Sequence, residues 1–406
     1  MVDPVSLLLL LAATIFLGYL GSVLYKSTRV PDVIWLLLFG LLLGPILQVY
    51  EVSLFWKVAP LMSVIALTLI LFGAGLSLNF YQTISLLPKT LLITIIKFVF
   101  SLILVGFFLG TFFPGFSLLD GLLLAAIVGG TDSAVIQALF KSFKRVEKGL
   151  ESVEAVLLLE SVINGVLCLV ATITFIQMHL TPTFSITESL SNIATVFSTG
   201  LCVGAGIGLG WLVITRGGKL ESFERVITLA ILFSCYACAE LVGGDGAGPV
   251  AALSFGLILG NASTMASIFR MTKRPTVDVA GLTKFNEELT FILRSFFFVL
   301  LGLITTVSSI TLIFGTICVV LIIIPRFITG KKLCKKLSFS EREMAIIAGV
   351  APNGLTAAVA AQLPYVFDPA GKYLPQPQVF VNLACVIIIE TIVFSAIYSA
   401  ILFRKR

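Results

Sequence analysis

Residues 125–133 read Ala-Ala-Ile-Val-Gly-Gly-Thr-Asp-Ser and lie inside a long apolar segment. Two adjacent glycines and the hydroxyl residues on either side of Asp132 weaken a helix and leave backbone carbonyls without intrahelical partners. A second interruption follows at residues 349–354, Gly-Val-Ala-Pro-Asn-Gly, where Pro352 removes a backbone donor and Gly354 permits an unwound turn. Interrupted apolar segments are tolerated at membrane depth where they line a protein or water cavity. Two of them favour a transporter built from inverted repeats.

The composition places the whole chain in a lipid bilayer. Of 406 residues, 58% are hydrophobic and only 12% are charged, and the mean hydropathy is +1.10. Because a soluble domain has about a quarter of its residues charged, this chain could not cover its surface in water. The same figures exclude a disordered chain, a coiled coil, a collagen and a secreted disulfide scaffold.

Apolar runs of about 20 residues, the length that crosses a bilayer, predict an all-α polytopic membrane protein with thirteen transmembrane helices. The expected ranges are 6–25, 32–49, 58–78, 90–113, 119–139, 155–177, 193–215, 224–242, 247–261, 288–304, 308–328, 343–363 and 378–403. The first run is too long for a signal-peptide core, so we interpret it as a retained span. We expect a single membrane domain over residues 1–406, with no soluble domain appended.

The basic residues predict the orientation of these helices. Of the 27 Lys and Arg residues, 22 fall in loops on one side or in the C-terminal tail, and only Lys57 and Lys372 fall in the opposite loops. Basic loops stay in the cytoplasm, so we expect an external N-terminus and a cytoplasmic C-terminus in a plasma or inner membrane. Topology also accounts for the net charge of +6, and no nucleic-acid partner is expected.

The charged residues that lie within the predicted spans, beyond their first two positions, include Lys97, Asp132, Glu160, Glu240, Arg294, Arg326 and Glu390. A charge at a helix centre costs about 3 kcal/mol, so each such group pairs, lines a wet cavity or is protonated. The positions of Glu240 and Arg326 near span ends favour end-capping or snorkelling. For Lys97 and Glu390, a structural interhelical ion pair is as good an interpretation as a functional role.

The sixth run contains Glu160-Ser161-Val-Ile-Asn164. Glu160 and Asn164 are four residues apart, so their side chains share one helical face. Carboxylate, hydroxyl and amide oxygens suit a hard monovalent cation, and a buried carboxylate can hold a proton instead. A site that takes either a cation or a proton, alternately open to each side, is that of an antiporter. Arg294 in the tenth run is a plausible partner for one of the two acids.

These residues resemble the monovalent cation/proton antiporters, specifically the NhaP-type sodium/proton branch. The likeness covers nearly the whole chain and rests on Val30-Pro31-Asp32 with Gly44-Pro45, Thr131-Asp132, Glu160-Ser161-x-x-Asn164, Arg294 before Phe-Phe, and Pro352-x-Gly354. The resemblance implies a homodimer with a thirteen-helix protomer. It also implies a moving six-helix core, which includes residues 119–177 and 288–363, and an interface domain formed by the remaining spans.

Two positions depart from the family pattern. The family's sixth-span aspartate, its principal cation and proton carrier, is Gly165 here, and the twelfth-span arginine that pairs with the fifth-span aspartate is Asn353. We hypothesise that Asp132, without that arginine, takes up a proton more readily and replaces the missing aspartate. Glu160 would then remain paired with Arg294 in a structural role.

The expected function is exchange of a monovalent cation, most simply Na⁺, for H⁺ with one cation per proton. Asp132 and Glu160 are the candidate ligands of the transported Na⁺, with Thr131, Ser161 and Asn164 nearby. The alternatives are the same fold carrying another solute, or a transport-inactive sensor or partner protein.

Other classes of chemistry have little support in the sequence. No enzyme motif and no cofactor is expected, and the partners are the transported ions, membrane lipid and a second copy of the chain. Cys235-x-x-Cys238 inside an apolar run is weak evidence for redox or metal chemistry. The single histidine, His179, predicts no histidine metal site and no obvious pH sensor.

Overall fold

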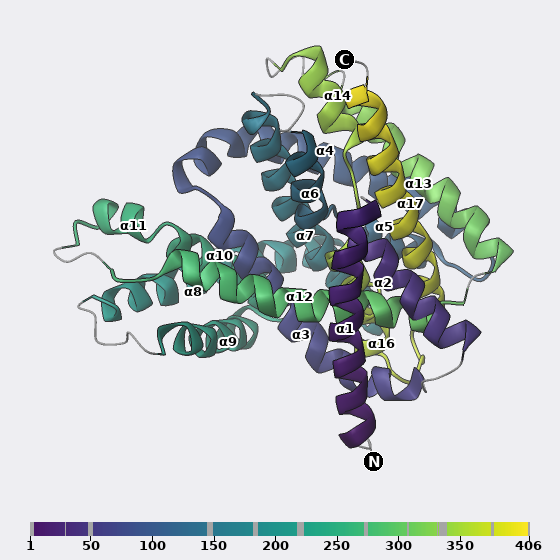
Figure 1. The fold of residues 1–406 in the computed structure, drawn as a ribbon, viewed down its shortest axis with the longest axis horizontal. Coiled ribbons are helices and arrows are strands. Elements are labelled where there is room, and N and C mark those ends of the chain that lie inside the picture. The colour runs from purple at the N-terminus through teal and green to yellow at the C-terminus, as the bar shows by residue number, and fades with distance from the viewer. Residues whose placement is uncertain are drawn as a thin grey trace. The chain divides into compact units, whose positions relative to one another are not determined.

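The computed structural model describes residues 4–28, 30–47, 52–143, 149–181, 186–216, 223–271, 275–306, 308–330, 332, 339–374 and 377–404. Every regular element in these ranges is a helix (Figure 1). The predicted all-α class is therefore confirmed. The chain divides into two compact units, formed by residues 1–63, 89–182 and 292–406, and by residues 64–88 and 183–291.

The first unit holds both interrupted segments. Its helices are α1 (Pro4–Thr28), α2 (Asp32–Leu41) with the π-helical turn η1 (Leu42–Ile46), α5 (Leu118–Val128), α6 (Ser133–Phe143), α7 (Glu151–Leu180), α13 (Ser309–Thr329), α14 (Glu341–Gly349), α15 (Leu355–Ala360), α16 (Leu363–Phe367) and α17 (Pro377–Arg404). Within it α5 packs on α7, and α13 lies along α17. The buried α7 is the element that α5, α6, α14, α15 and α16 all contact.

The second unit is built from α8 (Ile186–Ile214), α9 (Glu224–Gly243), α10 (Ala247–Gly260) and α11 (Ala262–Ile268). The helices α8, α9 and α10 pack on one another. Three further helices, α3 (Val52–Ser77), α4 (Phe80–Phe112) and α12 (Val279–Ile304), have residues in both units. The division of the protomer into a six-helix core and an interface domain stays a prediction.

Glycine permits a close crossing between α2 and α12 in the first unit. A Cβ atom added to Gly40 would lie 2.1 Å from the carbonyl oxygen of Val299 and 2.9 Å from Cα of Gly302. Backbone therefore packs directly on backbone there, as is common where membrane helices associate without a hydrophobic driving force.

Eight described helices are long and apolar enough to cross a membrane, and the bent pair α10 and α11 makes a ninth candidate. The eight are α1, α3, α4, α7, α8, α9, α13 and α17. The other four predicted crossings fall on the short α2 with η1, on the interrupted pairs α5/α6 and α14/α15, and on α12, which contains several charged residues. The chain is a multi-pass membrane protein, while the total of thirteen crossings stays a prediction.

Candidate functional site

Helix α5 ends at Val128 and α6 begins at Ser133, so residues 129–132 leave the helix in the middle of the apolar run. The carbonyls at such an end lack intrahelical partners and must be satisfied by other groups. Three buried side chains donate to them: Asn353 to Val128 at 2.5 Å, Asn164 to Gly129 at 2.7 Å, and Ser161 to Thr131 at 2.8 Å. Five of the residues that the sequence predicts for the site lie at this interruption: Thr131, Asp132, Ser161, Asn164 and Asn353.

The second interruption lies between α14 and α15, at residues 350–354. Two backbone amides of this interruption donate to hydroxyl groups of α17. The amide of Ala351 donates to Ser395 and the amide of Asn353 donates to Thr391, both at 3.1 Å. Both hydroxyl residues are fully buried. The unwound backbone is therefore held by protein groups, as a segment at membrane depth requires.

Asp132 joins the two interruptions. Its amide donates to the carbonyl of Pro352 at 2.8 Å. Its carboxylate accepts from the amide of Val135 at 3.0 Å, in the first turn of α6, and from the amide of Leu355 at 2.8 Å, where α15 begins. The side chain lies directly against Gly354, because a Cβ atom added there would be 1.9 Å from Oδ2 of Asp132. One buried carboxylate thus accepts hydrogen bonds from the beginnings of two helices.

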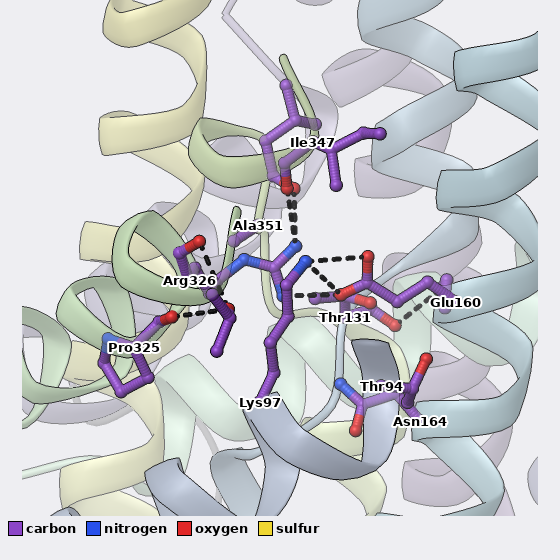
Figure 2. Close-up of polar contacts among 12 residues, drawn as sticks. Thr94, Lys97, Thr131, Glu160, Asn164, Pro325, Arg326, Ile347 and Ala351 are labelled. Atoms are coloured by element: carbon purple, nitrogen blue, oxygen red, sulfur yellow. Dashed lines mark hydrogen bonds and ion pairs between the residues drawn. The ribbon is translucent and has the colours of Figure 1, made fainter. Parts of the chain in front are cut away.

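Glu160 lies in a separate buried charge cluster (Figure 2). Its carboxylate is 3.2 Å from Nζ of Lys97 on α4 and 2.9 Å from Nη1 of Arg326 on α13. Glu160 is 1% exposed, and Lys97 and Arg326 are each 3% exposed. Arg326 also donates to the carbonyls of Val350 at 3.1 Å and Ile347 at 3.4 Å, at the end of α14. We call Lys97, Glu160 and Arg326 the charge triad.

The triad differs from the pairing expected from sequence. Arg326 was expected to snorkel at a span end, but the structure buries it against Glu160. Lys97 does form an interhelical ion pair, and its partner is also Glu160. Arg294, the expected partner of Glu160, instead donates to Asp32 at 2.6 Å, in a half-buried pair that joins α12 to α2.

Two other acids of the apolar runs, both half-buried, have contacts outside the site. Glu390 on α17 accepts from the hydroxyl of Thr316 on α13 at 2.7 Å. Glu240, in the second unit, accepts from the amides of Gly246 at 3.1 Å and Gly248 at 2.8 Å, which agrees with the expected end-capping role.

A polar stripe along α4 is the signal that could have placed Lys97 in the site from sequence. Thr90, Thr94, Lys97 and Ser101 recur at spacings of three and four residues inside an apolar run, which puts them on one helical face. All four are buried in the structure. Arg326 carries no comparable signal, since its neighbours in sequence are apolar or small.

Gly165 marks the place of the missing family aspartate. A Cβ atom added there would have Oγ1 of Thr356, on α15, as its nearest neighbour at 3.8 Å. Gly130, at the first interruption, is a close neighbour of Gly165, because its own added Cβ would be 3.9 Å from Cα of Gly165. The position therefore lies beside both interrupted segments and has room for a Cβ atom.

The oxygen atoms around the first interruption have the chemistry of a site for a hard cation. They comprise the Asp132 carboxylate, backbone carbonyls and the hydroxyl of Thr131. The Thr131 hydroxyl is buried and makes no hydrogen bond among the described residues. Those residues contain no cluster of three or more His, Cys, Asp or Glu side chains that would suit a tightly held transition metal.

Membrane-length helices, two of the apolar segments interrupted, and a buried carboxylate where the interruptions meet define a secondary transporter. The model of the family described as sodium/hydrogen exchanger, transmembrane, matches residues 12–404. The chain belongs to this family, which consists of transporters and not of enzymes.

Solved structures support the same fold. The sodium proton antiporter MjNhaP1 from Methanocaldococcus jannaschii superposes with a TM-score of 0.81 over 97% of each chain, at 21% sequence identity. At this identity the match establishes the fold.

Curated relatives include two antiporters with different cations in their names. The chain is 30% identical over 234 residues to the Na(+)/H(+) antiporter ApNhaP of Aphanothece halophytica, covering 57% of this chain and 42% of that one. It is 28% identical over 285 residues to the K(+)/H(+) antiporter NhaP2 of Shewanella sp. (strain ANA-3), covering 68% and 45%. The matches thus span less than half the length of these relatives.

Proposed function

We propose that this protein exchanges a monovalent cation, Na⁺ in the first instance, for H⁺ by alternating access. The observation that carries the proposal is the Asp132 carboxylate at the junction of the two interrupted segments, bonded to the amides of Val135 and Leu355. Family membership supports it. The names of the relatives support both Na⁺ and K⁺ as cargo.

Asp132 is the exchangeable group in this mechanism. A carboxylate can neutralise its charge with a cation or with a proton, and the two exclude each other because they occupy the same oxygens. The Thr131 hydroxyl, which has no described hydrogen-bond partner, supplies a second oxygen for the cation. Ser161 and Asn164 hold the interrupted backbone in place through the carbonyls of Thr131 and Gly129.

Glu160 is a positioning residue and does not carry the ion. Its carboxylate already faces the cations of Lys97 and Arg326, so a third cation there would be repelled. Through Arg326 the triad fixes the end of α14, directly before the second interruption. Asn353, which stands where the family has arginine, fixes the end of α5 through the Val128 carbonyl.

One exchangeable carboxylate implies one cation per proton, and therefore an electroneutral cycle. By resemblance the protein works as a homodimer, with its six-helix core moving against the interface domain. The distribution of basic loops supports an external N-terminus and a cytoplasmic C-terminus in the cell membrane. No cofactor takes part in this scheme.

The test is exchange by the purified protein in liposomes that hold an imposed pH gradient. Adding Na⁺, Li⁺ or K⁺ should collapse the gradient with the natural chain, and Asp132→Asn should reduce the rate to that of empty liposomes. The matched control is Asp278→Asn, the same chemical change at a side chain that is 50% exposed and pairs with Arg225 at the surface. This control should keep full activity.

Full activity in Asp132→Asn would overturn the role of Asp132. Silence of the natural chain toward every cation would favour the alternative that its fold serves another solute or has lost transport. The observation that favours this alternative is Gly165, because the family's principal carrier is absent there. Solute uptake by the same liposomes would then separate a repurposed transporter from an inactive one.

A further inference from the structure

The single histidine of the chain lies in a buried contact with an acid. Nε2 of His179, in the last turn of α7, is 3.0 Å from Oδ1 of Asp120, in the first turn of α5. The other ring nitrogen, Nδ1, is 2.8 Å from the carbonyl oxygen of Phe175. The two side chains are 8% and 4% exposed. The contact joins the same two helices that lead to Asp132 and carry Glu160.

Both ring nitrogens of His179 therefore face oxygen atoms, and the carbonyl of Phe175 can only accept. A neutral imidazole has one N–H and one lone pair, so it would place a lone pair against one of these two oxygens. An imidazolium has two N–H groups and satisfies both contacts. The Asp120 carboxylate is held in its charged form by Ser117, whose amide and hydroxyl donate to Oδ2 at 2.8 Å and 2.6 Å.

Few other titratable groups lie on the elements packed against this end of α7. Helix α5 supplies only Asp120, and α16 supplies Tyr365 and is followed by Asp368. Burial raises the pKa of the Asp368 carboxyl, but donation from the amides of Leu374 and Tyr373 outweighs this and holds the pKa below its usual value. Asp368 is therefore an anion committed to its own loop, and Asp120 is the described partner of His179.

We propose that His179 and Asp120 form a buried binding site for one proton that ties the first turn of α5 to the last turn of α7. With the proton bound, the site is an ion pair with every ring nitrogen satisfied. Without it, a lone pair faces either Asp120 or the carbonyl of Phe175, and the tie between the two helices weakens. The site lies on the side predicted to be external, so the bound proton comes from that side.

This inference is independent of the transported solute and of the role of Asp132. It also differs from the expectation from sequence, in which His179 was no obvious pH sensor. Spacing could not reveal the site, because 59 residues separate the histidine from its acid.

The experiment uses nitrogen NMR of the full chain in lipid nanodiscs, labelled with ¹⁵N only at histidine. Since the chain has one histidine, the spectrum reports this ring alone without any substitution. We expect both ring nitrogens to be protonated at neutral pH, where an exposed histidine with a pKa of about 6.5 is mostly neutral. A single neutral tautomer throughout the range from about pH 5 to 8 would overturn the proposal.

Asp120→Asn provides the second measurement. Its amide keeps the size of the carboxylate but removes the charge, so the proton affinity of His179 should fall about tenfold or more. An unchanged titration in a variant that remains folded by gel filtration would refute the assignment of Asp120. Asp278→Asn, at an exposed aspartate in the other unit, should leave the titration as it is in the natural chain.

Discussion

At the scale of single residues, the charge triad shows how a buried acid is held in a membrane. Glu160 is 1% exposed and has two cationic partners, Lys97 and Arg326. An unpaired charge in such surroundings is costly. Replacing one member of a buried pair is therefore destabilising, because it leaves the other charge uncompensated. The three positions should therefore differ in what their removal does.

Glu160→Gln should be the most damaging substitution in the triad. It leaves the charges of Lys97 and Arg326 without their carboxylate, and breaking a buried ion pair in this way costs about 3–5 kcal/mol. Lys97→Met leaves one acid facing one base and should cost clearly less. Thermal unfolding of the detergent-solubilised protein measures both. Equal loss in the two variants would contradict the assigned geometry.

Sequence located the residues of the candidate site better than their partners. Asp132, Ser161, Asn164 and Asn353 were singled out because glycine, proline and polar residues interrupt apolar runs, which is a local signal. Ion pairing between helices has no such local signal. Arg326 does lie in the last turn of α13, as predicted, but its burial against Glu160 was not predicted.

At the scale of helices, α6 and α15 begin at the same carboxylate. Gly354 makes this possible through its size alone, because its φ of −165° is extended backbone that any residue can adopt. The apolar spans that contain α6 and α15 could be predicted from their length. The meeting of their beginnings could not, because residues 132 and 354 are brought together only by tertiary packing.

Gly354→Ala should displace the start of α15 from Asp132. The new Cβ would lie 1.9 Å from Oδ2 of Asp132, and overpacking of this kind costs about 1–3 kcal/mol. We expect loss of cation-dependent gradient collapse in liposomes.

The matched control is Gly206→Ala in α8, where an added Cβ meets no atom within 4 Å. It should keep its activity, and alanine favours a helix over glycine. A fully active Gly354→Ala variant would show that the close contact with Asp132 is dispensable.

At the scale of the whole molecule, the chain differs from the family pattern at Gly165 and Asn353. In the proposed cycle, these two differences decide how many exchangeable charges the protein has. The chain keeps the family fold over nearly its full length without the family's sixth-span aspartate. Under the proposed function, transport therefore depends on a different carboxylate, Asp132, in place of the residue at position 165.

Gly165→Asp tests this dependence. An added Cβ at this position meets Thr356 of α15 at 3.8 Å as its nearest neighbour, so the first atom of the new side chain fits without a clash. Combined with Asp132→Asn, it should restore cation-dependent gradient collapse that Asp132→Asn alone lacks. Gly165→Asn, which has the same size without the charge, should not. Equal behaviour of the two would show that a charge at this position does not serve exchange.

The charge triad has a consequence for the energetics of transport under voltage. Its three side chains sum to one positive charge, and none of them is exchanged in the proposed cycle. If Asp132 is neutralised by either cargo, and if Lys97 on α4 moves together with Glu160 and Arg326, that positive charge travels with the part of the protein that moves. A membrane potential does work of about 2.3 kcal/mol on each unit charge carried through 100 mV. The conformational step would then run at a rate set partly by voltage, even though each complete turnover moves no net charge.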